Sequence, residues 1–266
     1  MEEFMHFIGG TMEEPGVISW WHLIMVIPII AASILVPYFL KDTSEKVYKR
    51  VLLISWIILL VLEFFKELIK AFHYGNPSYW EYSLRDFPFS ICSMVYYFIP
   101  IILFVDKKKH PSIVDAANGY MCFILLTAGI VVCTYTKMAT DTFIYINVQT
   151  FIHHGSQVVL GLLVFVWNRK NITIKTFYRS MIAFGITVVI AISINLIFYG
   201  LFPGRFVNMF FINPTIITNL PIGNIVQEKA GYPVYLIGFL SLIALVTFLT
   251  YLVETSIYKL VLKKQS

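Results

Sequence analysis

The chain has 266 residues, a mean hydropathy of +0.77 and only 13% charged residues, a balance that excludes an ordinary soluble domain. Its formal net charge is +5, but the alternating basic and aromatic side chains of a nucleic-acid surface are absent, so we expect no nucleic-acid partner. The long apolar runs instead predict a helical membrane protein.

Seven apolar runs follow one another, and each is close to the roughly 20 residues that cross a ~30 Å hydrocarbon core. They cover residues 18–40, 48–70, 87–104, 113–135, 148–167, 177–202 and 232–254. The third run is the shortest. These runs predict an all-α, polytopic bundle of seven transmembrane helices that forms one domain over residues 1–266.

Lysine and arginine are distributed unevenly between the connections, and short cytoplasmic connections carry an excess of both residues. The basic residues of the first, third and fifth connections and of the tail are Lys41, Lys46, Lys49, Arg50, Lys107, Lys108, Lys109, Arg169, Lys170, Lys175, Arg179, Lys259, Lys263 and Lys264. These are 14 of the 20 lysines and arginines, whereas the segment before the first run is acidic. We therefore expect a multi-pass protein of the cell membrane with its N-terminus outside and its C-terminus in the cytoplasm.

The one long connection spans residues 203–231 and is broken by turn-forming pairs such as Asn213-Pro214 and Gly223-Asn224. It also contains apolar side chains, including Met209 and Phe210, which favour a loop packed on the bundle. Long ordered loops often cover functional sites. We expect this outside loop to act as a lid.

Polar side chains of different runs fall at one depth on the outer side when the runs cross alternately. They are His22, Glu63, Lys66, Glu67, Cys92, His153, His154, Gln157 and Asn195. An ionisable group in a spanning helix costs about 2.5 to 3.5 kcal/mol on insertion scales, so such a group of residues predicts a functional site.

Charged residues of the second run recur at helical spacing. Glu63, Lys66, Glu67 and Lys70 share one face, where opposite charges can neutralise one another. One interpretation is a buried ion pair that fixes the packing of this helix. The other is that Glu63 acts as an acid or base or orients a histidine. The sequence leaves both open.

The fifth run places His154 and Gln157 on a polar face, while His153 points about 100° away. Either histidine could be a satisfied core residue, or His154 could be a general base. Cys92 could then be a nucleophile or simply a packed thiol, and Ser90 or Ser93 could replace it. His153, His154, Glu63 and Cys92 are also zinc-ligand types, but no spacing specifies a site, so we expect neither metal nor cofactor.

Several motifs together resemble a known family. They are His22, Glu63 with Lys66, Trp80, Phe87-Pro88-Phe89-Ser90-Ile91-Cys92, Phe151-Ile152-His153-His154-Gly155, Asn208-Met209-Phe210 and Gly231-Tyr232-Pro233-Val234-Tyr235. The pattern is similar to the YwaF-like integral membrane proteins. Two positions depart from it: bacterial members have histidine in place of Ser90, and the eukaryotic branch has cysteine in place of Phe89.

The resemblance implies acyl chemistry, because the eukaryotic branch is a cysteine-dependent acyltransferase of ether phospholipids. Together with the shared depth of these residues, it favours the hypothesis of Cys92 as nucleophile, His154 as base and Glu63 as its orienting group. The residues expected to bind substrate are His22, Lys66, Glu67, Ser90, His153, Gln157, Asn195 and Asn208. The partner would be a membrane phospholipid. A transporter or small-ligand-binding subunit that uses Glu63, Lys66 and the histidines is the alternative, and the sequence does not fix the oligomeric state.

Overall fold

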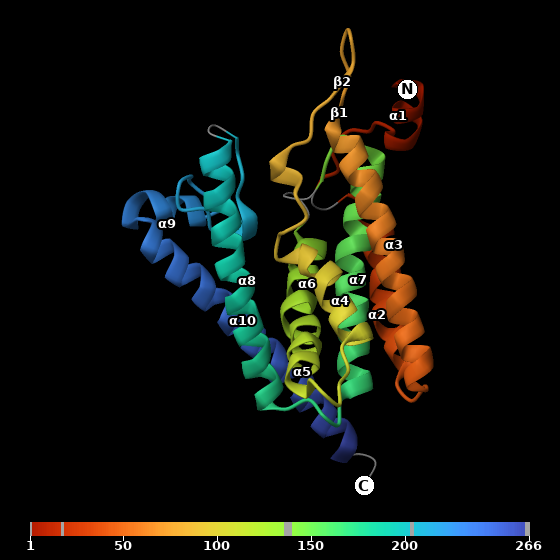
Figure 1. Ribbon diagram of the computed structural model, residues 1–266. Helices are drawn as coiled ribbons and strands as arrows, with labels where there is room; N and C mark the ends of the chain where they lie inside the picture. Colours follow the sequence, from red (N-terminus) through yellow and green to blue (C-terminus); the bar gives the residue numbers. More distant parts are fainter. Residues whose placement is uncertain (1, 17–18, 136–139, 203–204, 264–266) are drawn as a thin grey trace.

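The computed structural model describes residues 2–16, 19–135, 140–202 and 205–263, and it confirms an all-α chain (Figure 1). Outside the described residues lie residue 18 of the predicted first run, residues 203 and 204 of the predicted loop, and Lys264 of the predicted tail. The α-helices are α1 (Glu2–Gly9), α2 (Trp20–Leu40), α3 (Glu45–Ala71), α4 (Val95–Phe104), α5 (Pro111–Gly119), α6 (Leu126–Thr134), α7 (Ile144–Asn168), α8 (Ile174–Leu201), α9 (Gly223–Ala230) and α10 (Tyr232–Lys263).

Short elements connect or interrupt these helices. A π-helical turn, η3 (Tyr120–Leu125), joins α5 to α6, and 3-10 turns form η1 (Leu84–Asp86), η2 (Cys92–Met94) and η5 (Met209–Phe211). Strands β1 (Phe72–His73) and β2 (Tyr79–Trp80) pair antiparallel beyond the end of α3, with Phe72 opposite Trp80. The predicted helical runs therefore account for most of the regular structure.

Five helical segments of the described chain are long and apolar enough to cross a membrane. They are α2, the continuous run Pro111–Thr134, α7, α8 and Tyr232–Leu260 of α10. Helix α3 has 27 residues, but Glu63, Lys66 and Glu67 make its last turns more polar than these five segments. The third predicted run contributes only the shorter apolar helix Cys92–Phe104.

The third run differs from the prediction because only its second half is helical. The ring of Pro88 disfavours a helical residue before it, and Phe87 has φ −51° and ψ 127°. Ser90 Oγ then accepts a hydrogen bond from Ser93 N at 3.2 Å, and η2 begins between them. Cys92 therefore lies at the start of a helix, where the chain changes direction.

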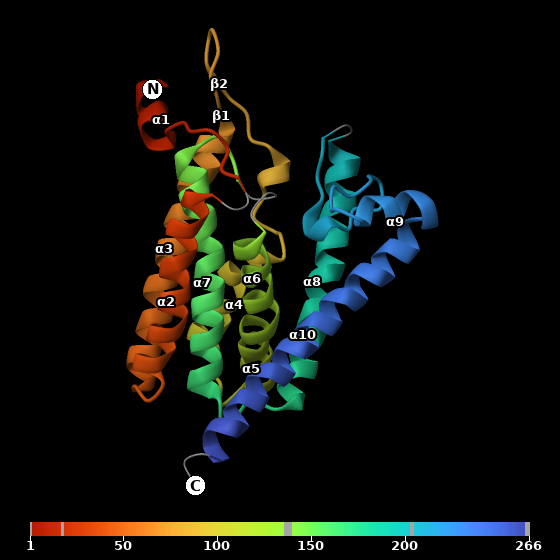
Figure 2. The ribbon, with the colours of Figure 1, turned by 180° about the vertical axis from the view of Figure 1, so that it is seen from behind.

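Helix α7 runs through the middle of the bundle between α2 and α6 (Figures 1 and 2). A Cβ atom at Gly155 would lie 2.6 Å from Ile29 of α2, and one at Gly129 of α6 would lie 2.6 Å from the carbonyl oxygen of His154. Side chains do not tolerate such distances, so glycine allows both helices to approach. The histidine-bearing turn of α7 is thereby held between its two neighbours.

Helices α8 and α10 form the other side of the molecule, and the long tilted α10 returns from α9 to the opposite end (Figures 1 and 2). The loop before α9 is attached to α8 through Asn195. Its Nδ2 donates to the carbonyl oxygen of Met209 at 3.0 Å, and its Oδ1 accepts from Met209 N at 2.7 Å. Met209 and Phe210 are buried, so this part of the loop packs on the bundle.

Candidate functional site

A hydrogen-bonded network of buried side chains joins α3, α4 and α7. Oε2 of Glu63 accepts from the Tyr96 hydroxyl at 3.0 Å and from Gln149 Nε2 at 3.1 Å. The Tyr96 oxygen also lies 2.8 Å from Nδ1 of His153. All four side chains are buried, and buried polar groups need such partners to offset the loss of water. The network therefore explains how a carboxylate and a histidine are accommodated between apolar helices.

The amide of Gln157 lies between Cys92 and His153. Its Nε2 donates to the carbonyl oxygen of Cys92 at 2.9 Å, a group that can only accept, and lies 2.9 Å from Nε2 of His153. These contacts match a neutral His153 ring whose Nε2 accepts from Gln157 and whose proton is on Nδ1. That proton is donated to Tyr96, whose own hydroxyl proton goes to Glu63. Both nitrogens of His153 are thus occupied.

Lys66 forms ion pairs with two carboxylates on the same face of α3. Its Nζ lies 2.5 Å from Oε1 of Glu63 and 3.0 Å from Oε1 of Glu67. The Lys66 side chain is 19% exposed and that of Glu63 is 10% exposed. One turn further, Lys70 pairs with Asp141, which precedes α7. The predicted charged face of the second run is therefore an ion-paired cluster that ties α3 to its surroundings.

His154 occupies a different position from His153. Its ring packs edge-on against the His153 ring with centroids 4.9 Å apart, and its Nδ1 is buried without a hydrogen bond to a described residue. An imidazole with an unoccupied nitrogen can take up a proton. Of the two adjacent histidines, His154 is the one with a ring nitrogen, Nδ1, that makes no hydrogen bond to a described residue, although Gln157 also contacts its ring.

Cys92 lines an apolar cavity of about 280 Å³ between α6, α10 and the loop before α9. The walls are almost entirely hydrocarbon, with Val131 from α6, Phe211 and Leu220 from the loop and Phe239 from α10. The neighbouring hydroxyls of Ser90 and Ser93 bond to each other at 2.9 Å. A thiol beside an apolar cavity of this size is a chemically distinctive combination, because the cavity suits a hydrocarbon chain.

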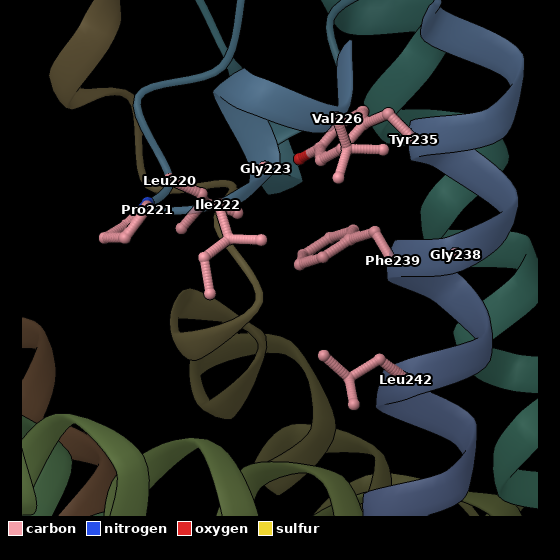
Figure 3. Close-up of a pocket in the computed structure, with 9 residues that line it drawn as sticks. All are labelled: Leu220, Pro221, Ile222, Gly223, Val226, Tyr235, Gly238, Phe239 and Leu242. Atoms are coloured by element: carbon pink, nitrogen blue, oxygen red, sulfur yellow. The ribbon is translucent and has the colours of Figure 1, made fainter. Parts of the chain in front are cut away.

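A second apolar cavity of about 360 Å³ adjoins the first. Figure 3 shows the side chains of Phe239 and Leu242 extending from α10 toward the loop segment that carries Leu220 and Ile222. Leu220, Phe239 and Leu242 line both cavities. The two spaces therefore lie on either side of one shared wall of apolar side chains.

The chain matches the model of the TMEM164 family over residues 17–251. The chain belongs to the TMEM164 family. No curated protein and no solved structure matches it. This TMEM164-family chain is a membrane protein with several membrane-spanning helices, and the matched region includes every residue of the candidate site.

The structure of this TMEM164-family chain gathers some of the predicted site residues and separates others. Glu63, Lys66, Glu67, His153 and Gln157 belong to one polar cluster, and Gln157 connects it to Cys92. The other predicted residues lie around this cluster, in separate contacts.

His22 and the two asparagines make contacts of their own. His22 Nε2 bonds to the carbonyl oxygen of Cys133 at 2.8 Å, which links α2 to the end of α6. Asn195 holds Met209, and Oδ1 of Asn208 accepts from Asn213 N at 2.9 Å within the loop. The roles of these three residues in substrate binding stay predictions.

Sequence reasoning missed Tyr96 as a member of the site and did not assign a role to Gln149. Tyr96 lies in an aromatic and aliphatic stretch where a tyrosine resembles ordinary membrane-helix composition. Its position four residues after Cys92, on the same face of the helical stretch, was the available signal. Gln149, four residues before His153, gave the corresponding signal on α7.

Proposed function

We propose that this chain is a membrane-embedded lipid enzyme in which Cys92 carries out acyl transfer or acyl hydrolysis on phospholipids. Its resemblance to the YwaF-like proteins, with their ether-phospholipid acyltransferase branch, supports acyl chemistry. The structural observation that carries the proposal is the apolar cavity beside Cys92. An acyl chain in that cavity would bring its ester group to the part of the wall formed by Cys92.

The location of the site follows from the proposed topology. Seven spans with an outside N-terminus would place Cys92 and the polar cluster in the outer half of the cell membrane. The loop before α9 would then lie on the outer side, where Phe211 and Leu220 cover the cavity. Exclusion of water by this lid would protect a thioester from hydrolysis until an acceptor arrives.

The reaction begins when the thiol of Cys92 loses its proton to His154. The sulfur attacks the ester carbonyl carbon of the phospholipid, the carbon–oxygen bond to glycerol breaks, and the glycerol oxygen takes the proton from His154. An acceptor hydroxyl, or water in hydrolysis, then attacks the thioester and gives up its proton, which restores the Cys92 thiol. The two products are a lysophospholipid and an acylated acceptor or free fatty acid.

The polar cluster would hold the reacting groups in place. Gln157 fixes the backbone of Cys92, and Gln157 is held through its bond to His153. Glu63 acts on His153 indirectly, through the hydroxyl of Tyr96. This arrangement makes Glu63 a positioning residue that orders the neutral His153 beside the proposed base.

Intact mass spectrometry of the purified protein in phospholipid nanodiscs tests the proposal. We expect an acyl adduct on the wild type that hydroxylamine removes, and its loss in Cys92→Ala. Cys133→Ala is the matched control, because Cys133 is a free thiol that does not line the cavity and should keep the adduct.

Filling the cavity provides a second test that leaves the thiol intact. Ala128→Phe places an aromatic ring in the cavity, whereas Ile130→Phe places one on an exposed part of α6. We expect the first variant to lose the adduct and the second to retain it. Adducts that survive both Cys92→Ala and Ala128→Phe would refute the proposal. A polar solute bound at Glu63 without any adduct would favour the transport alternative.

A further inference from the structure

A second candidate site lies near the start of the continuous helical run α5–η3–α6. The Cys92 cavity lies along the later half of that run. Here a polar cavity of about 270 Å³ is bounded by the chain before α5, by the beginning of α8 and by the end of α7. Lys107, Lys175 and Arg179 contribute three basic side chains to it, and Asp115 contributes one carboxylate. The cavity therefore has an excess of positive charge.

The carboxylate is already occupied by neighbouring groups. Asp115 accepts from Arg179 Nη1 at 2.7 Å and from Thr176 Oγ1 at 2.9 Å. Neither Lys107 nor Lys175 forms an ion pair with a described residue. Both lysines are exposed at the cavity and are free to contact an anionic ligand. The N-terminal ends of α5 and α8 at the same cavity add the positive ends of two helix dipoles.

A buried asparagine adds an independent requirement for a ligand. Asn118 lines the cavity, is 5% exposed, and its Oδ1 has no hydrogen-bond partner among the described residues. A buried acceptor without a partner is costly, and a hydroxyl group of a ligand would satisfy it. The cavity therefore suits a ligand that carries both a phosphate and a hydroxyl group.

An apolar groove continues from the same cavity. Arg179 belongs to the walls of both, and beyond it a space of about 410 Å³ extends between α5 and α8. Ile113, Ala116, Ile182 and Ala183 line this groove, and the two isoleucines are largely exposed on the surface of the bundle. A polar cavity that opens into an apolar groove matches the two parts of a membrane lipid.

We infer that this composite site binds an anionic glycerophospholipid whose headgroup carries free hydroxyls, as phosphatidylglycerol does. The phosphate would lie between Lys107, Lys175 and Arg179, a headgroup hydroxyl would reach Oδ1 of Asn118, and one acyl chain would follow the groove. The site lies among the basic connections, which the positive-inside rule assigns to the cytoplasmic leaflet. The inference does not depend on the chemistry proposed for Cys92.

Binding of fluorescent phosphatidylglycerol, labelled on an acyl chain, to the full-length protein in neutral detergent tests the headgroup part. Each basic residue near a lipid phosphate contributes about 1 kcal/mol, so Lys107→Gln with Lys175→Gln should weaken binding by roughly tenfold or more. Lys108→Gln with Lys170→Gln removes the same charge outside the cavity and should leave binding nearly unchanged. Equal losses in both pairs would show diffuse attraction and overturn the site.

The groove is tested by a variant that leaves the headgroup cavity intact. Ala183→Leu fills the groove and should weaken phosphatidylglycerol binding, whereas the side chain of Gly185→Leu extends into open space and should not. Competition by sn-glycerol 3-phosphate separates a lipid from a soluble phosphate ester. If that compound binds as tightly as the lipid and Ala183→Leu has no effect, the lipid assignment is wrong. Absence of saturable binding to the wild type would reject the site altogether.

Discussion

The side-chain amide of Gln157 holds the backbone carbonyl of Cys92 at 2.9 Å and the ring of His153 at the same distance. One side chain of α7 therefore connects the first residue of η2 to the polar cluster of α3 and α4. The thiol of Cys92 remains available to the apolar cavity, since its backbone makes the polar contact. The proposed chemistry depends on this arrangement, in which the backbone of Cys92 is held in place and its thiol faces the apolar cavity.

Cys92 and His154 should behave as one catalytic unit. We expect Cys92→Ala and His154→Ala each to abolish most acyl turnover, and the double variant to be little worse than either, because losses within a unit are not additive. Initial rates of lysophospholipid release, with melting temperatures as a control for folding, provide the measurement. Full activity in Cys92→Ala would refute the nucleophile assignment and direct attention to Ser90 and Ser93.

Lys66 should be more costly to remove alone than together with Glu63. Lys66→Met leaves Glu63 buried without its cation, at roughly 3 to 5 kcal/mol, whereas Glu63→Gln with Lys66→Met removes both charges of this pair and should cost less. Glu63→Gln alone should be the mildest single change, because Lys66 keeps its ion pair with Glu67. Unfolding in detergent measures the three variants. Strictly additive losses would show that the two side chains do not stabilise each other. Glu45→Gln with Lys49→Met is the control, because that ion pair is exposed on the same helix.

The charged part of the polar cluster could be predicted from helical spacing alone. The spacing of Glu63, Lys66 and Glu67 specifies a shared face of a helix, and the structure confirms the ion pairs between them. The seven apolar runs also predicted the location of the main helices. These features depend on local periodicity, which a single sequence contains.

Contacts between helices could not be obtained in the same way. The predicted polar face of α7 placed Gln157 with His154, but its spacing does not show that Gln157 Nε2 donates to the carbonyl oxygen of Cys92, which belongs to another element. Tyr96 joins Glu63 to His153 across three helices, a relationship that no spacing within one run encodes. Packing against neighbours, made close by Gly129 and Gly155, decides such contacts.

The ion pair between Lys70 and Asp141 should make stability depend on pH. Burial raises the pKa of Asp141, but the hydrogen bond and the charge of Lys70 lower this pKa by a larger amount. The net pKa of Asp141 therefore lies below its ordinary value of 3.8. The stabilisation is thus present above pH 3.8 and is lost as the pH falls through the lower folded pKa. Melting temperatures between pH 3 and 7 should fall less steeply toward acid in Asp141→Asn than in the wild type. Identical slopes would contradict the prediction.

The proposed topology makes opposite predictions for the two ends of the bundle. In a variant without the native cysteines, an impermeant thiol reagent applied to intact cells should label Met12→Cys and should not label Ser112→Cys. Permeabilised cells provide the control, since both positions should then react. Labelling of Ser112→Cys alone in intact cells would invert the orientation and would move the Cys92 cavity to the inner half of the membrane.

Tyr96→Phe should separate the roles of the two histidines. Loss of the hydroxyl leaves Nδ1–H of His153 without its acceptor and removes one donor from Glu63, so we expect a loss of about 1 to 3 kcal/mol in stability. If His154 is the base, turnover should fall, because His153 and Gln157 are held less firmly, but the pH–rate profile should stay unchanged, because Tyr96 contacts His153. If the pH–rate profile shifts while the protein stays folded, His153 carries the proton transfer instead. Tyr97→Phe is the matched control, because its more exposed hydroxyl donates only to the carbonyl of Pro88 among the described residues and should affect neither property.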